Sequence, residues 1–108
     1  MPNNLKNIRA SAFLHQNGHC IYCDKLMWLS APLHFAVQQK ITTKQARLFQ
    51  CTAEHLLARK DGGTNATANI AAACLFCNRH RHMRKTELTP VQFQMHVRKR
   101  IKQGRWQA

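Results

Sequence analysis

Two pairs of cysteines have the spacing of metal-binding knuckles. Cys20 and Cys23 form one Cys-x-x-Cys pair, and Cys74 and Cys77 form the second. Two residues between thiolates let one tight turn direct both sulfur atoms at a single ion, and two such turns complete a closed tetrahedral Zn²⁺ site. A single Cys-x-x-Cys motif would also suit redox chemistry, but two such motifs together predict structural zinc. Five cysteines are an odd number and argue against a disulfide framework, so Cys51 is expected to be a small buried hydrophobe.

A second set of chemically capable residues begins at Glu54 and His55 and continues to Asn69 and Asn78, which directly follows the second knuckle. A histidine titrates near neutral pH and can act as a base, and carboxylate and amide oxygens suit a hard divalent cation. The stretch 61–65, Asp-Gly-Gly-Thr-Asn, is a strong turn signal between them. Two structural alternatives remain: an ordinary ion pair of Glu54 with His55, and a simple turn role for Asn69.

An acid–histidine pair, a Gly-Gly turn, Asn-Ile and Cys-x-x-Cys-Asn follow one another in an order that resembles the HNH family of nucleases. The resemblance covers residues 20–23 and 53–81. It implies a ββα-metal, or His-Me finger, fold and metal-dependent hydrolysis of DNA phosphodiester bonds. The expected fold class is therefore α+β, a small ββα-metal finger stapled by a four-cysteine zinc site and flanked by N- and C-terminal helices.

The resemblance also implies a role for each residue of the motif. His55 corresponds to the general base, and Asn69 to an asparagine that ties down the loop or orients the His55 ring. Glu54 and Asn78 correspond to ligands of a catalytic divalent ion, which is Mg²⁺, Mn²⁺ or another. Glu54 stands where the family frequently has aspartate and Ala58 where proline is common, and neither departure removes a catalytic group.

His80, Arg81 and His82, which follow Asn78 in the chain, are further candidates for the site. His82 shares a helix face with Asn78, four residues earlier. Some members of the family, colicin-type nucleases among them, have a metal-binding histidine at this offset, so His82 is either a third metal ligand or a solvent-facing side chain. His80 should point away and contact a phosphate or nothing. Arg81 stands where the family often has lysine and is expected to reach a phosphate.

Positive charge dominates the composition. Seventeen lysines and arginines against four acids give a net charge of +13. Such a field attracts polyanions, so nucleic acid is the first candidate partner, an anionic membrane surface the second, and a merely solvated basic face the alternative. Phosphate contacts release counterions, so binding should weaken with salt. The residues expected to contact nucleic acid are Arg59, Lys60, Arg79, Arg81, Arg84, Lys85, Arg98, Lys99, Arg100 and Lys102.

The elements that position these residues are predicted from hydrophobic spacing and from helix start and stop signals. Residues 48–53 are typical of a short strand, residues 56–68 of a loop closed near Asn69, and residues 70–73 of either a helix or a strand. Helices are expected over residues 5–16, from Pro32 onward, from Thr42 or Thr43 to Arg47, from 74 to about 83 and from about 90 to 103.

Apolar spacing predicts which side each flanking helix buries. Leu33 and Val37, with Ile41 as a further candidate, should line the inner face of the helix that begins at Pro32, and Phe35 is also expected in the core. Val91 and Met95, with Val97 as a further candidate, should line the inner face of the last helix, with its basic residues facing water or phosphate. Only the tail after Gly104 looks detachable. The other histidines have no ligand-like spacing and are expected to be structural or solvent-facing: His15, His19, His34 and His96.

The 108 residues are expected to form one HNH nuclease domain, residues 1–108, with its core motif at 53–82. The longest apolar run, residues 70–77, is too short for a membrane span, and no secretory signal is visible, so a cytoplasmic protein without a membrane partner is expected. DNA is the expected partner, RNA is left open, and the chain acts as a monomer, which would nick, or as a homodimer. The rival functions are an inactive zinc-ribbon nucleic-acid-binding module and an accessory subunit of a larger DNA-processing complex.

Overall fold

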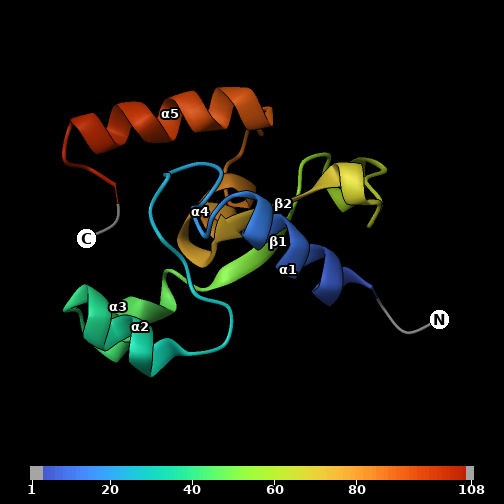
Figure 1. The fold of residues 1–108 in the computed structure, drawn as a ribbon. Helices are drawn as coiled ribbons and strands as arrows, with labels where there is room; N and C mark the ends of the chain where they lie inside the picture. The colour runs from blue at the N-terminus through green and yellow to red at the C-terminus, as the bar shows by residue number, and fades with distance from the viewer. Residues whose placement is uncertain (1–3, 107–108) are drawn as a thin grey trace.

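A two-stranded antiparallel sheet lies at the centre of the molecule with helices around it (Figure 1). The computed structural model describes residues 4–106. Strand β1 (Cys51–His55) pairs with β2 (Ile70–Cys74), and Cys51 lies opposite Cys74 at one end of the ladder. Helix α4 (Leu75–His82) follows β2 directly. This β-β-α order beside a cluster of four cysteines confirms the expected fold class.

Four further helices flank this unit. Pro32 begins α2 at its first turn, and capping boxes at Thr42 and Thr89 begin α3 and α5, so local signals explain these helix starts. Figure 1 shows α2 and α3 as a pair at one end of the molecule, while α5 lies across α4. The flanking helices are α1 (Leu5–His15), α2 (Pro32–Gln39), α3 (Thr43–Arg47) and α5 (Pro90–Lys102), and two short 3₁₀ turns, Arg59–Asp61 and Thr67–Asn69, lie in the loop between the strands.

The first strand begins three residues later than the sequence predicts. Residues 48–50 instead close the turn after α3, and β1 extends to His55. The ambiguous segment after Asn69 is a strand, and all five residues of β2 are buried. On the outer edge of β2, the backbone polar groups of Ala72 have hydrogen-bond partners. The Gln16 side chain accepts from the Ala72 N–H and donates to the Ala72 C=O, and the Ile21 N–H donates to the same oxygen. Small alanines allow these segments to approach the strand closely.

The buried faces of α2 and α5 match the predicted ones only in part, since Val97 and Phe35 are buried as expected while the other residues predicted within these two helices are exposed. In α5, Phe93 and Val97 are buried, while Val91 is 68% and Met95 66% exposed. The ring of Phe93 meets Tyr22 edge-on with centroids 4.9 Å apart. Burial of an aromatic ring contributes more than burial of Val91, so the ring decides how the helix is turned. In the same way α2 buries Phe35 and Ala36 and exposes the predicted Leu33 and Val37.

The tail after Gly104 is not detachable, because Trp106 is only 9% exposed. Its indole N–H donates to Cys77 Sγ over 3.3 Å. The main core therefore joins the cysteine cluster to α5 and to this tail. Over residues 4–106, the structure has no helix with the length and apolar character that a membrane crossing requires.

Candidate active site and metal centre

The four knuckle cysteines converge as the sequence predicts. Their sulfur atoms all lie within 4.8 Å of one another, and the four residues are buried. Cys23 Sγ lies 3.9 Å from Cys74 Sγ. A tetrahedral ion with bonds of about 2.3 Å holds its sulfur ligands about 3.8 Å apart, so the cluster has the dimensions of a metal site. The four side chains are positioned to bind a metal ion, and an all-cysteine set of donors is typical of structural zinc.

Backbone amides and one indole surround this sulfur cluster with donors. The amides of Tyr22 and Cys74 donate to Cys20 Sγ, and the amide of Cys77 donates to Cys74 Sγ. Hydrogen bonds from Cys23, Cys74 and Cys77 lower the pKa of Cys20 well below its ordinary value. Such donors stabilise thiolates, which are the form that binds a metal.

A pocket of about 290 Å³ lies at the junction of β1, the loop and α4, and it collects most of the HNH-like residues. Glu54, His55, Asn78 and His82 all line it, whereas Asn69 does not. These positions are up to 28 residues apart in the chain, and the strand pairing together with the β2–α4 junction brings them together. The lining also includes Ala58, Arg59, Lys60 and Glu87.

Glu54 is fully buried and its carboxylate is held on both oxygens. Oε2 accepts hydrogen bonds from Tyr22 Oη over 2.6 Å and from Arg81 Nη1 over 2.9 Å. Oε1 lies 2.9 Å from His82 Nε2. A buried charge requires this degree of compensation. The hydrogen bond and the nearby carboxylate, together with burial, raise the pKa of Tyr22 above its ordinary value, with burial as the largest cause.

The prediction that Arg81 reaches a phosphate is wrong. Arg81 is only 3% exposed. Its guanidinium donates to the Glu54 carboxylate and to the backbone oxygens of His55, Leu56 and Leu88. Arg81 instead neutralises the buried carboxylate and ties β1 to the end of α4. The sequence does not reveal that Tyr22 and Arg81 are partners of Glu54, because both lie far from it in the chain and the predicted strand ends at residue 53.

The His55 ring is oriented by Asn65, a contact that the sequence did not reveal. Asn65 Oδ1 lies 2.7 Å from His55 Nε2. Because an amide oxygen only accepts, this contact places a proton on Nε2 and leaves Nδ1 as the ring nitrogen that can accept one. The tight turn at 61–65 places Asn65 there, so the turn signal was the available clue.

Asn69 ties down the loop, which is one of the two roles left open for it. Its Oδ1 accepts from the Leu57 N–H, and its Nδ2 donates to the carbonyls of Leu57 and Thr64. Gly63 packs so closely that a Cβ there would lie 1.7 Å from the Leu57 carbonyl oxygen. The loop is therefore held in one shape directly after His55.

His82 lies between two carboxylates, Glu54 and Glu87. Its Nδ1 is 2.9 Å from Glu87 Oε1, and this hydrogen bond lowers the pKa of Glu87. Asn78 Nδ2 donates to Thr52 Oγ1, which directs the amide. The 2.9 Å between Glu54 Oε1 and His82 Nε2 is a hydrogen-bond distance, so the imidazole ring bridges the two carboxylates.

The predicted basic residues are spread over several surfaces. Arg59 and Lys60 line the pocket beside His55, and Lys60 Nζ lies 3.5 Å from Glu87 Oε2. Arg98 donates to the Tyr22 carbonyl through Nε. Arg84 and Arg100 line a different pocket. The remaining ones are exposed on α4, α5 or the segment between them: Arg79, Lys85, Lys99 and Lys102.

A family model described as HNH endonuclease matches residues 41–84. The match spans α3, both strands, the loop and α4. It contains the whole motif from the acid–histidine pair to Cys-x-x-Cys-Asn, whereas the first knuckle, Cys20 and Cys23, lies outside it. Residues 41–84 are thus similar to the HNH endonuclease family, as the motif resemblance predicts. No curated protein and no solved structure matches the chain.

Proposed function

We propose that this protein is a metal-dependent endonuclease that hydrolyses DNA phosphodiester bonds, with His55 as the general base. The observation that carries the proposal is one pocket in which a histidine with an open Nδ1 lies beside a carboxylate, an amide and a second histidine. The HNH domain supports nuclease activity at the level of the family.

His55 removes the proton from the attacking water. Its Nδ1 accepts the proton, and the Asn65 amide oxygen on Nε2 holds the ring in place and stabilises the imidazolium that forms. Histidine is the side chain best suited to accept a proton in this step near neutral pH. Arg59 and Lys60, at the rim of the same pocket, attract the phosphate and hold it there.

Glu54, Asn78 and His82 form the candidate site for a divalent ion. When bound, such an ion acts as a Lewis acid on the phosphate and on the leaving oxygen. Tyr22 and Arg81 fix Glu54 through Oε2 and leave Oε1 directed at His82. The four-cysteine cluster is proposed to hold zinc with a purely structural role. Four cysteine ligands would fill the tetrahedral shell and leave no position for water or substrate.

A plasmid-nicking assay tests the proposed activity. Purified protein with Mg²⁺ or Mn²⁺ should convert supercoiled DNA to the open circular form, since one site per chain makes one cut. His55→Ala should lower the rate by about 10²–10⁴-fold, the usual contribution of general-base catalysis. His34→Ala is the matched control, because His34 is exposed on α2 away from the pocket. Equal rates for His55→Ala and the parent would refute the assignment of the base.

One observation favours a second function, a nucleic-acid-binding module without activity. Both oxygens of Glu54 already have protein partners, so the carboxylate is compensated without any ion. A metal count separates the two functions. One firmly held zinc together with a second, exchangeable divalent ion and nicking supports the enzyme; one zinc alone and no nicking supports the module.

A further inference from the structure

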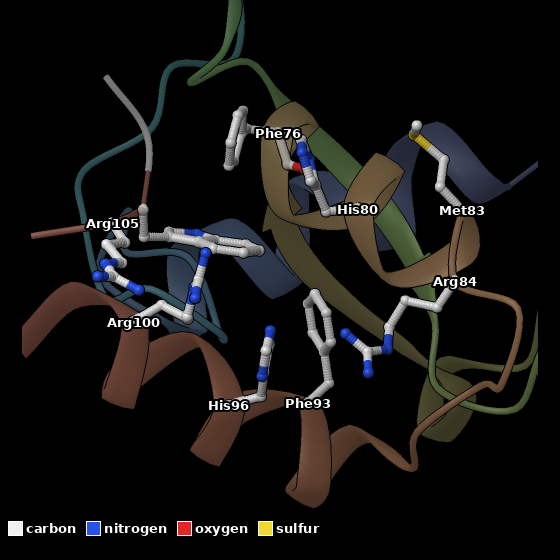
Figure 2. Close-up of a pocket in the computed structure, with 9 residues that line it drawn as sticks. Phe76, His80, Met83, Arg84, Phe93, His96, Arg100 and Arg105 are labelled. Atoms are coloured by element: carbon white, nitrogen blue, oxygen red, sulfur yellow. The ribbon is translucent and has the colours of Figure 1, made fainter. Parts of the chain in front are cut away.

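A second and larger pocket, of about 510 Å³, lies between α4 and α5 (Figure 2). Phe76 and His80 turn into it from α4, whereas Asn78 and His82 line the candidate active site. Positions two apart on a helix are rotated by about 200°, so α4 separates the two pockets. The volume falls within the range typical of small-ligand sites. The nuclease proposal assigns no role to this pocket.

Aromatic rings form the walls of this second pocket. His80 stacks on Phe76 with centroids 4.0 Å apart, and Trp106 meets the two rings edge-on at 5.3 and 5.1 Å. Phe93 and His96 come from α5 and lie across the pocket from Phe76 and His80 (Figure 2). Each has its ring centroid 6.0 Å from that of Trp106. Phe93 and Trp106 are almost fully buried, so the partly exposed rings of Phe76, His80 and His96 provide the surface on which a planar base can stack.

Three arginines surround the rings: Arg84, Arg100 and Arg105. None of the four acids of the chain lines the pocket. Within residues 4–106 the ion pairs involve other cations, so the charge of these arginines has no carboxylate partner. Burial first, and then the neighbouring charges of Arg84, Arg100 and Lys99, lower the pKa of His96 at the edge of the same pocket. The charge of this pocket is therefore complementary to an anionic ligand.

We propose that this pocket binds an unpaired nucleotide of single-stranded DNA, with the base against the aromatic rings and the phosphates on Arg84 and Arg105. Aromatic rings and arginines combine in this way where proteins bind single strands, because an unpaired base has a free face, whereas in a duplex the bases are stacked on each other. The inference concerns binding and goes beyond the proposed cleavage, so it stands whether or not His55 cuts DNA.

The two tryptophans provide a direct readout by NMR. Trp106 lies in the pocket, whereas the Trp28 indole donates to the Ala46 carbonyl in the separate α2–α3 core. Zinc-loaded His55→Ala protein is titrated with 5′-phosphorylated tetrathymidylate, without added divalent ion. The Trp106 indole signal should shift and saturate while the Trp28 signal stays in place. A saturating shift at Trp28 with none at Trp106 would overturn the proposal.

Further probes identify what the pocket binds. An abasic strand of equal length, inorganic phosphate, thymidine 5′-monophosphate and a duplex of the same sequence should each bind at least tenfold more weakly than tetrathymidylate at Trp106. Equal affinity for the abasic strand or phosphate would reduce the pocket to an anion site. Equal affinity for the mononucleotide would make it a free-nucleotide site, and equal affinity for the duplex would remove the need for an unpaired base. Each of these outcomes overturns the proposal.

Charge removal inside and outside the pocket provides the matched control. The double variant Arg84→Gln, Arg105→Gln should weaken tetrathymidylate binding by about tenfold and reduce the slope of log K against log salt by about 1.4, for two phosphate contacts on a single strand. Arg79→Gln with Lys102→Gln removes the same charge from exposed positions that do not line the pocket. Its effect should stay within about threefold. Equal losses in the two variants would show a diffuse field and overturn the site.

The binding result and the nicking result are independent of each other. Nicking by the parent without a Trp106 response overturns the nucleotide pocket and leaves the nuclease proposal in place. A saturating Trp106 response without nicking overturns the nuclease proposal and leaves the nucleotide pocket in place.

Discussion

At the residue scale, the arrangement around Glu54 has the largest consequences. The chain has four acids, and this one is completely buried. Tyr22 and Arg81 compensate Oε2, and Oε1 faces His82. A carboxylate held in this way cannot rotate freely, so its position in the pocket is set by the protein in advance of any ligand.

Removal of Arg81 should be strongly destabilising. In Arg81→Leu the Glu54 carboxylate stays buried without its cation, and breaking such a pair costs about 3–5 kcal/mol. Denaturant unfolding of the zinc-loaded protein measures this change. The control Arg79→Leu, on the exposed side of α4, should change stability by no more than about 0.5 kcal/mol. A similar small change for Arg81→Leu would mean that the carboxylate is neutral or solvated.

Cys51 should resist alkylation while the protein is folded. Burial raises the pKa of its thiol to about 11, and the thiolate is the reactive form. At pH 8, mass spectrometry after iodoacetamide treatment should find Cys51 unmodified, and modified once the protein is unfolded. The same shift lowers stability as pH rises from about 9 toward 11, because the unfolded thiol releases its proton first. Rapid labelling of the folded protein at pH 8 would contradict the raised pKa.

At the scale of elements, the loop between β1 and β2 determines where His55 and Asn65 meet. The Asn69 side chain makes two hydrogen bonds with the Leu57 backbone, which join the two ends of this loop, and donates a third to the Thr64 carbonyl in its middle. The loop has only two short 3₁₀ turns of its own, so its shape depends on these bonds and on the close approach at Gly63.

Asn69→Ala should loosen the loop without disrupting the sheet. Loss of the bonds to Leu57 and Thr64 should lower stability by about 1–3 kcal/mol. Hydrogen exchange should accelerate over residues 57–65 and stay slow in β1 and β2. Nicking should fall at the same time, because the loop positions the Asn65 partner of His55. Asn7→Ala, at an exposed position of α1, is the control. Unchanged exchange in the loop would show that other contacts hold it.

Helices were easier to predict than their orientation. Pro32, the Thr42 cap and the Thr89 cap are local signals, and the helices begin there. The buried faces were predicted from aliphatic spacing, but Phe35 and Phe93 decide them. Spacing shows which residues share a side of a helix, whereas the choice of side depends on the partner against which the helix packs.

At the scale of the whole molecule, the four-cysteine cluster is part of the main hydrophobic core. Cys20, Cys74 and Cys77 are packed in the same cluster as Phe93, and the Trp106 indole donates to Cys77 Sγ. Metal binding and the packing of α5 are therefore physically connected.

Removal of the metal should unfold the protein and not only the knuckles. Metal analysis should find one tightly bound zinc per chain, and a chelator should abolish most of the helical circular dichroism, because binding to such sites is coupled to folding. Cys51→Ala is the control and should retain the zinc, while Cys20→Ala should lose it. Helical signal that persists after complete zinc removal would separate the fold from the metal.

The sequence by itself determined the knuckles, the acid–histidine pair, the helix starts and the turn at 61–65, because each of these depends on residues that are close together in the chain. The tertiary structure alone decided that Tyr22 and Arg81 hold Glu54, across 32 and 27 residues, and that Phe76 and Trp106 share a wall of the second pocket. Local spacing cannot specify such pairs, since packing of the whole chain chooses among many possible partners. The partners of a buried charge and the lining of a pocket therefore became known only from the fold.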